Sequence, residues 1–159
     1  MGIIVRPATD SDLDALRANE PRPELGLVDK HFAAQQAGTL LYVVAVEDDT
    51  PIGTAVLDLD ADSMTPELRN MFVYPAARRK GAGRALSRYL EDEARKRGFA
   101  AVYLAVDPNN EKAVPLYVSL EYHPTGEHLF VDEPEVEQVD DETQASEHYA
   151  IYKKSLTVR

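Results

Sequence analysis

Arg78-Arg79-Lys80-Gly81-Ala82-Gly83 is the stretch that decides the fold, because it places three cations and two glycines directly before a long amphipathic segment. The N-terminus of a helix has unpaired N–H groups and the positive end of the helix dipole, so it normally carries Asp, Glu, Ser or Thr rather than Arg and Lys. Extra cations are tolerated there when an anion binds. The two glycines would let the backbone approach that anion closely, in turn conformations that a Cβ would forbid. The stretch therefore predicts a site for a phosphorylated small molecule, and the alternative is a solvated basic turn.

The segments next to this basic turn predict a strand, a helix and a second strand. Residues 67–73 are typical of a strand that leads into the turn, and residues 100–106 are typical of a buried strand. Apolar residues recur between them at intervals of three and four, which predicts a helix that ends at Gly98. These apolar residues are Ala82, Ala85, Leu86, Tyr89 and Leu90.

Further elements are expected on both sides of this unit. The N-terminal part first predicts a strand at 3–6 and a helix through Leu13 and Leu16 that Thr9 to Asp12 can cap. A second helix is expected to be capped by Asp29, to end at Gly38 and to point Phe32, Ala33 and Ala37 inward. An antiparallel hairpin of 40–46 with 52–59 follows. The C-terminal part predicts a helix that starts at 108–110, followed by strands at 126–131 and 148–152.

Composition indicates one soluble domain over residues 1–159. The chain has no Cys and no N-terminal apolar run, which favours a cytoplasmic location. Its net charge of -11 argues against nucleic acid as a partner, and residues 132–147 hold acids without a base. That acidic stretch either attracts a cationic amine or is simply solvated. The four histidines lack the spacing of metal ligands, so no metal is expected.

Three motifs resemble the GNAT superfamily of acyl-CoA-dependent N-acyltransferases. They are Val73-Tyr74-Pro75, the Arg-x-x-Gly-x-Gly run at 78–83, and Asn110-x-x-Ala113-x-x-Leu116-Tyr117. Their order and spacing match this family, and a Walker loop or a dinucleotide fingerprint does not fit the glycines. The resemblance implies an α/β (α+β) fold with a central mixed, mostly antiparallel sheet flanked by helices, and transfer of an acetyl group from acetyl-CoA to a primary amine of a small molecule or peptide.

The resemblance also implies which residues hold acetyl-CoA. Its pyrophosphate would lie on the amides of residues 79–84, and its pantetheine arm would pair with the backbone of residues 71–73 like an added strand. The implied cofactor-binding residues are Met71, Phe72, Val73, Arg78, Arg79, Lys80, Gly81, Ala82, Gly83, Arg84, Asn110 and Tyr117. Asn110 is equally consistent with a helix cap.

Catalytic roles follow from the same resemblance. The Val73 N–H would polarise the thioester carbonyl, and the Tyr117 phenol would protonate the leaving thiolate. Glu67 or an ordered water would accept the proton of the amine. With a period of two residues, Glu67, Arg69, Met71 and Val73 are expected on one face of the strand, which would place the carboxylate in line with the thioester. Glu67 is equally consistent with a solvated acid at a strand edge.

Two departures from the family pattern concern the helix that carries Tyr117. Leu120-Glu121-Tyr122 stands where the family usually has Leu-Gly-Phe, and Pro115 removes a backbone donor. Both are expected to affect the position of Tyr117 more than the cofactor site. A homodimer is consistent with the sequence, and a CoA-binding sensor without turnover is the alternative function.

Overall fold

The computed structural model describes residues 2–20, 23–60, 65–78, 80–106, 113–130 and 148–156. Within these residues the chain forms a seven-stranded sheet in the order β1-β2-β3-β4-β5-β7-β6. The strands β4 and β5 are parallel, and all other neighbours are antiparallel. The strands are β1 (Ile4–Pro7), β2 (Leu40–Glu47), β3 (Thr50–Asp58), β4 (Glu67–Val73), β5 (Ala101–Val106), β6 (His123–Phe130) and β7 (His148–Ser155). The expected mixed, mostly antiparallel sheet is confirmed.

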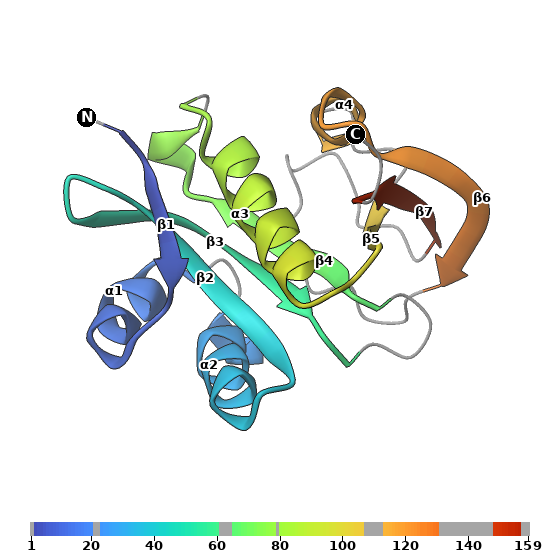
Figure 1. Ribbon diagram of the computed structural model, residues 1–159. Helices are drawn as coiled ribbons and strands as arrows, with labels where there is room; N and C mark the ends of the chain where they lie inside the picture. The colour runs from blue at the N-terminus through green and yellow to red at the C-terminus, as the bar shows by residue number, and fades with distance from the viewer. Residues whose placement is uncertain are drawn as a thin grey trace.

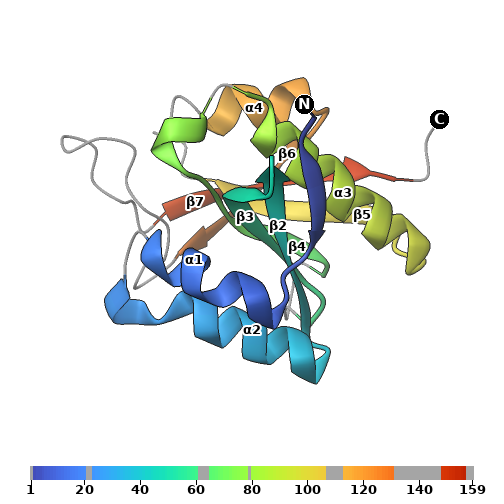
Figure 2. The same cartoon turned by 90° about the vertical axis from the view of Figure 1, so that its left-hand side faces the viewer.

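The α-helices of the described residues cover both faces of this sheet (Figure 1). They are α1 (Leu13–Ala18), α2 (Leu27–Ala37), α3 (Ala82–Lys96) and α4 (Ala113–Ser119). Figure 2 shows α1 and α2 together on one face and α3 with α4 on the other. Each face has its own hydrophobic cluster, with Val43 and Leu57 on the α3 side and Val44 and Val56 on the α1–α2 side. Because both faces are buried, β2 and β3 are continuous apolar runs.

The hairpin of β2 and β3 closes through a turn at Asp48 and Asp49. Both residues have positive φ angles, 52° and 64°, as a two-residue type I′ turn requires. Such a turn matches the right-handed twist of the two strands. The predicted antiparallel hairpin is therefore confirmed, with the turn at the polar residues between the two apolar runs.

The helix α2 differs from its prediction at the N-terminal end. Its N-cap is Gly26, so Asp29 lies within the first turn, where it pairs with Arg17 of α1 at 2.7 Å. The residues buried on α2 are Val28 and His31, whereas Ala33 and Ala37 are exposed. The buried face is set by packing on β2, because the His31 ring lies 5.2 Å from the ring of Tyr42. The expected end at Gly38 is confirmed by its φ of 87°.

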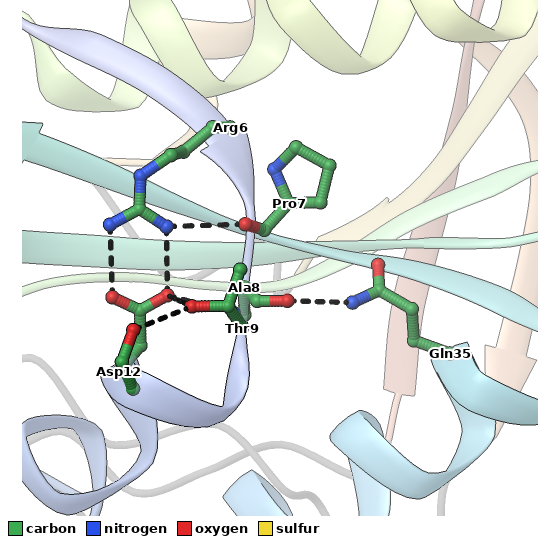
Figure 3. Close-up of polar contacts among 7 residues, drawn as sticks. Arg6, Pro7, Ala8, Thr9, Asp12 and Gln35 are labelled. Atoms are coloured by element: carbon green, nitrogen blue, oxygen red, sulfur yellow. Dashed lines mark hydrogen bonds and ion pairs between the residues drawn. The ribbon is translucent and has the colours of Figure 1, made fainter.

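A polar cluster joins β1 to the start of α1 (Figure 3). The Arg6 guanidinium donates two hydrogen bonds to the Asp12 carboxylate, at 2.8 and 2.9 Å. The backbone N–H and the hydroxyl of Thr9 donate to the same carboxylate at 2.8 and 3.0 Å. On the other side, Gln35 of α2 donates to the Ala8 carbonyl at 3.2 Å and accepts from the Tyr42 N–H at 2.8 Å. The cluster fixes both N-terminal helices to the sheet.

The C-terminal half is built around α3. Leu86, Leu90 and Ala94 on α3 are fully buried, which confirms the apolar stripe, and Gly98 follows with a φ of 89°. The strand β6 begins at His123 and β7 extends to Ser155, so both are longer than expected. The acidic stretch 132–147 lies outside the described residues. No helix in the described part of the chain is long and apolar enough to cross a membrane.

Candidate functional site

The strands β4 and β5 separate from each other along their length. Among the described residues they share one registered pair, Glu67 with Tyr103, and the Tyr103 N–H donates to the Pro66 carbonyl at 3.0 Å. Beyond this pair β4 continues to Val73 and β5 continues to Val106, with no further register between their described residues. Among the described residues, residues 71–73 of β4 thus have no strand in register with them on the β5 side. An unpaired strand edge is suited to an extended ligand that forms backbone hydrogen bonds.

A β-bulge in β4 divides this strand into two parts with opposite orientations. Between Arg69 and Phe72, two residues of β4 lie opposite one residue of β3, and Asn70 has a φ of 54°. Before the bulge Leu68 lies in the cluster on the α3 side, and after it Met71 and Val73 pack against that same cluster. Alternation therefore places Glu67 on the opposite face from Met71 and Val73.

The expectation that Glu67, Arg69, Met71 and Val73 share one face is therefore wrong. A strict period of two holds only in a regular strand, and the extra residue at the bulge reverses the alternation. Arg69 instead pairs with Asp58 on β3 at 3.0 Å. Glu67 lies at the end of β4 where β5 is paired, six residues before Val73.

The main chain of Val73 is directed away from β3. The Tyr74 N–H donates to the Ile52 carbonyl on β3 at 2.9 Å, and in an antiparallel pair the adjacent residue points its N–H and C=O the opposite way. The Val73 carbonyl accepts a hydrogen bond from Arg78 Nε at 2.9 Å. The Val73 N–H accordingly faces the space between β4 and β5, where a bound acyl group would need a hydrogen-bond donor.

The basic turn leads into α3 through Gly81, the N-cap, which has a φ of 90°. Within α3, all of which the structure describes, the first turn contains no acidic residue. The N-terminus of the helix therefore keeps its positive potential, as an anion site requires. Gly83 does not adopt the turn conformation expected for it, because it lies inside α3. A Cβ there would lie 3.3 Å from Leu116 Cδ2 and 3.5 Å from Met71 Sδ, so the glycine allows close packing.

The described cations around this turn contact protein groups. Arg78 holds the Val73 carbonyl and lies 5.7 Å from the centre of the Phe72 ring. Lys80 pairs with Glu47 at 3.1 Å, and Arg84 donates to the Ser119 hydroxyl at 3.1 Å. These contacts attach the turn to β4, to the β2–β3 hairpin and to α4. Direct phosphate contacts by these side chains stay a prediction, and Arg79 and Asn110 lie outside the described residues.

Tyr117 extends from α4 to β4. Its hydroxyl donates a weak hydrogen bond to Met71 Sδ at 3.8 Å, and its ring lies edge-on to Tyr122 at 5.9 Å between centres. Burial raises the pKa of Tyr117 to about 12, which keeps the phenol protonated at neutral pH. Met71 thus contacts Tyr117 and lies beside Gly83, so the second and third sequence motifs meet at a side chain of the strand that leads into the first motif.

The turn after α4 forms without the glycine that the family usually has there. The Glu121 N–H donates to Val118 O at 2.9 Å and the Tyr122 N–H donates to Tyr117 O at 3.0 Å, which together form a Schellman motif. Glu121 occupies the left-handed position with a φ of 75°, where glycine is usual. Within the described part of α4, Pro115 is the third residue.

One group near the site was missed by the sequence analysis. Glu91, within α3, is buried and accepts hydrogen bonds from Tyr122 and Lys154. The available signal was Tyr122 itself, because a tyrosine in place of the usual phenylalanine requires a partner for its hydroxyl. Among the described residues, no group of three or more His, Cys, Asp or Glu side chains is placed to share a metal ion.

Comparison with known proteins identifies the family. The model of the acetyltransferase (GNAT) family matches residues 7–122. The chain belongs to the GNAT acetyltransferase family. This GNAT chain is 35% identical over 95 residues to the [ribosomal protein bS18]-alanine N-acetyltransferase of Escherichia coli (strain K12), a match that spans 60% of the chain and 63% of that protein.

Solved structures show the same fold at lower identity. The crystal structure of the ribosomal-protein-S18-alanine N-acetyltransferase from Escherichia coli superposes with a TM-score of 0.72 at 24% identity, over 99% of this chain and 96% of that one. A putative acetyltransferase from Salmonella typhimurium, solved with its cofactor acetyl-CoA, superposes with a TM-score of 0.75 at 21% identity, over 100% and 96% of the two chains. These superpositions show that the chain shares the fold of these acetyltransferases.

Proposed function

We propose that the protein is an acetyl-CoA-dependent N-acetyltransferase that acts on a primary amine of a small molecule or peptide. The observation that carries this proposal is the convergence at Met71, where the backbone edge of β4, the first turn of α3 at Gly83 and the phenol of Tyr117 come together. A strand edge, a helix N-terminus and a proton donor are the groups that an acyl-CoA and its leaving thiolate require.

In this proposal the cofactor lies along the gap between β4 and β5. The backbone of residues 71–73 pairs with the pantetheine arm, and the amides at the start of α3 hold the pyrophosphate. The open edge of β4 and the absence of acids in the described first turn of α3 support this placement. Gly81 adds support, because its left-handed conformation exposes the start of the helix without a side chain.

The reaction proceeds by direct attack. The neutral amine forms a C–N bond to the thioester carbonyl, and the Val73 N–H stabilises the negative charge that develops on the carbonyl oxygen. The C–S bond then breaks, and the thiolate takes the proton of the Tyr117 phenol. The phenol carries this proton before the thiolate forms, because burial raises the pKa of Tyr117 to about 12. The products are an amide and CoA, and solvent returns the proton to Tyr117.

The proton of the amine goes to an ordered water or to Glu67. Six residues of extended strand span roughly 20 Å, whereas proton transfer requires hydrogen-bond contact or one intervening water. Glu67 also lies on the face opposite Met71 and Val73. This geometry favours water as the first acceptor, so Glu67 acts only through a relay.

The acceptor is tested by release of CoA thiol with a panel of amines. The similarity to bS18-alanine N-acetyltransferases places a peptide with an N-terminal alanine first in the panel, followed by polyamines, amino acids, aminoglycosides and basic peptides. Mass spectrometry of the product identifies the acetylated amine. Tight acetyl-CoA binding without thiol release on any of these acceptors would instead support a CoA-binding sensor.

The role of Tyr117 is tested by Tyr117→Phe. General acid catalysis contributes on the order of 100-fold or more, so turnover should fall by about that factor while the Kd for acetyl-CoA changes little. Tyr89→Phe is the matched control, because Tyr89 is a half-buried tyrosine within α3 whose pKa is also raised by burial. Unchanged turnover in Tyr117→Phe removes the phenol from the mechanism.

A further inference from the structure

The buried carboxylate of Glu91 joins three elements of the C-terminal half. Only 4% of Glu91 is exposed. Its Oε2 accepts a hydrogen bond from the Tyr122 hydroxyl, and its Oε1 accepts one from Lys154 Nζ, both at 2.9 Å. Each carboxylate oxygen thus has its own partner, from the turn after α4 and from β7. A buried charge is tolerated when it is paired and hydrogen-bonded in this way.

Tyr122 is held from several directions at once. Its side chain is fully buried, and the Lys154 ammonium lies 5.8 Å from the centre of its ring. Burial, together with the charge and the hydrogen bond of Glu91, raises the pKa of Tyr122, so the hydroxyl remains a donor. The ring of Tyr122 therefore has little freedom to move.

The same residue holds Tyr117 by two independent contacts. The Tyr122 N–H donates to the Tyr117 carbonyl at 3.0 Å, and the two rings are in edge-to-face contact with an angle of 74° between their planes. The Tyr117 hydroxyl also donates to Met71 Sδ at 3.8 Å, a weak hydrogen bond because sulfur is a poor acceptor, and the Tyr117 ring packs against the cluster on the α3 side. The edge-to-face contact with Tyr122 therefore helps to set the direction of the phenol.

We propose that Glu91, Tyr122 and Lys154 form a positioning unit for the Tyr117 phenol. This inference rests on the proposed function, in which Tyr117 protonates the thiolate. Glu91 fixes the Tyr122 ring through its hydroxyl, and the Tyr122 ring fixes the direction of Tyr117. Lys154 pairs with the buried carboxylate, so that Glu91 stays ionised and keeps its hydrogen bond to Tyr122.

The first test is Tyr122→Phe, which removes a single hydroxyl and keeps the ring. A misplacement of 1 Å at a catalytic group can cost about 100-fold in rate, so a partial loss of alignment should lower kcat by about 10-fold. The KM for acetyl-CoA should stay within about two-fold, because the unit contacts the expected cofactor site only through Tyr117, whose ring is kept. Tyr89→Phe is again the control. An unchanged kcat in Tyr122→Phe would overturn the inference.

A double variant separates this inference from the proposed function. In the Tyr117→Phe background, Tyr122→Phe should lower kcat no further, because the group that it positions is absent. A second full loss of 10-fold would show that Tyr122 acts independently of Tyr117 and would overturn the positioning role alone. A normal kcat for Tyr117→Phe by itself would instead remove Tyr117 from the proposed mechanism.

The charge of Lys154 is tested by Lys154→Met and Lys154→Arg. The methionine variant leaves Glu91 without its cation and should lose more than 10-fold in kcat, whereas arginine should restore most of it. Lys153→Met is the matched control, because Lys153 is the adjacent, exposed lysine of β7 on the other face. Equal losses in the methionine and arginine variants would contradict the charge argument.

A measurement that requires no acceptor completes the test. The ring of Tyr117 should flip slowly in the wild-type protein, so that NMR of ring-labelled tyrosine resolves its two sides, with Tyr117→Phe used for assignment. In Tyr122→Phe the two signals should merge as flipping becomes faster. Identical Tyr117 signals in both proteins would show that the Tyr122 hydroxyl does not restrain the phenol.

Discussion

Gly53 on β3 offers a direct test of the backbone edge proposed to bind acetyl-CoA. It pairs with Val73 on β4, and a Cβ at this glycine would lie 2.9 Å from the Phe72 carbonyl oxygen and 3.2 Å from the Val73 Cα. Both atoms belong to the main chain, so no side chain can rotate away. The variant Gly53→Ala therefore forces the end of β4 to move.

The size of the effect follows from these distances. Ordinary contacts of a Cβ begin near 3.4 Å, so the backbone at Phe72 and Val73 must shift by about 0.5 Å. Overpacking of this kind costs about 1–3 kcal/mol of folding free energy. The Val73 N–H moves with the backbone. Since 1 Å of misplacement can cost about 100-fold, a shift of half that size should lower kcat/KM by about 10-fold.

The assays are calorimetric titration with acetyl-CoA, chemical denaturation and thiol release. We expect Gly53→Ala to raise the Kd for acetyl-CoA by about 10-fold and to lower the unfolding free energy by about 1–3 kcal/mol. Gly2→Ala is the control, because a Cβ at Gly2 meets no described atom within 4 Å. Wild-type affinity in a destabilised Gly53→Ala protein would refute the assignment of this backbone to the cofactor site.

Two further predictions concern stability. The Arg6 hydrogen bonds lower the pKa of Asp12 from 3.8 to about 2, which corresponds to about 2 kcal/mol of folding free energy, reduced to about 1–2 because Arg6 is 41% exposed. Because the pKa of Asp12 is lower in the folded than in the unfolded protein, its carboxylate stabilises the fold at pH values above the unfolded-state pKa. Asp12→Asn should therefore destabilise the protein most at neutral pH. The loss of unfolding free energy, measured by denaturation, should shrink as pH falls from 4 toward 2. Asp14→Asn, at an exposed acid, should show no deficit, and a constant Asp12→Asn deficit would contradict the linkage. Glu121→Gly should raise the unfolding free energy by roughly 0.5–1 kcal/mol, because it relieves a left-handed φ of 75° at a small entropic cost, and a lower Tm would be the contrary result.

Several features of the fold could be predicted because they depend on neighbouring residues. The apolar spacing of α3, its glycine-marked ends at Gly81 and Gly98, and the turn between β2 and β3 are set by local hydrogen bonding and by side-chain periodicity. The order of motifs on these elements was sufficient to indicate the GNAT family. The positions of the basic turn and of Tyr117 also follow from this order.

Other features were decided only by the tertiary structure. The bulge at Asn70 depends on the register of β4 with β3, and it reverses the face on which Met71 and Val73 lie relative to Glu67. The need for a glycine at position 83 depends on the close packing of Leu116 of α4 against α3.

The burial of Glu91 illustrates the physical reason. Its hydrogen-bond partners lie 31 and 63 residues away in the chain, at Tyr122 and Lys154. Periodicity reports which residues share a face of one element, but the pairing of a buried charge is settled only when separate elements pack together. The sequence by itself determined the elements, their order and the family. The tertiary structure decided which side chains meet at Met71 and what holds Tyr117 in place.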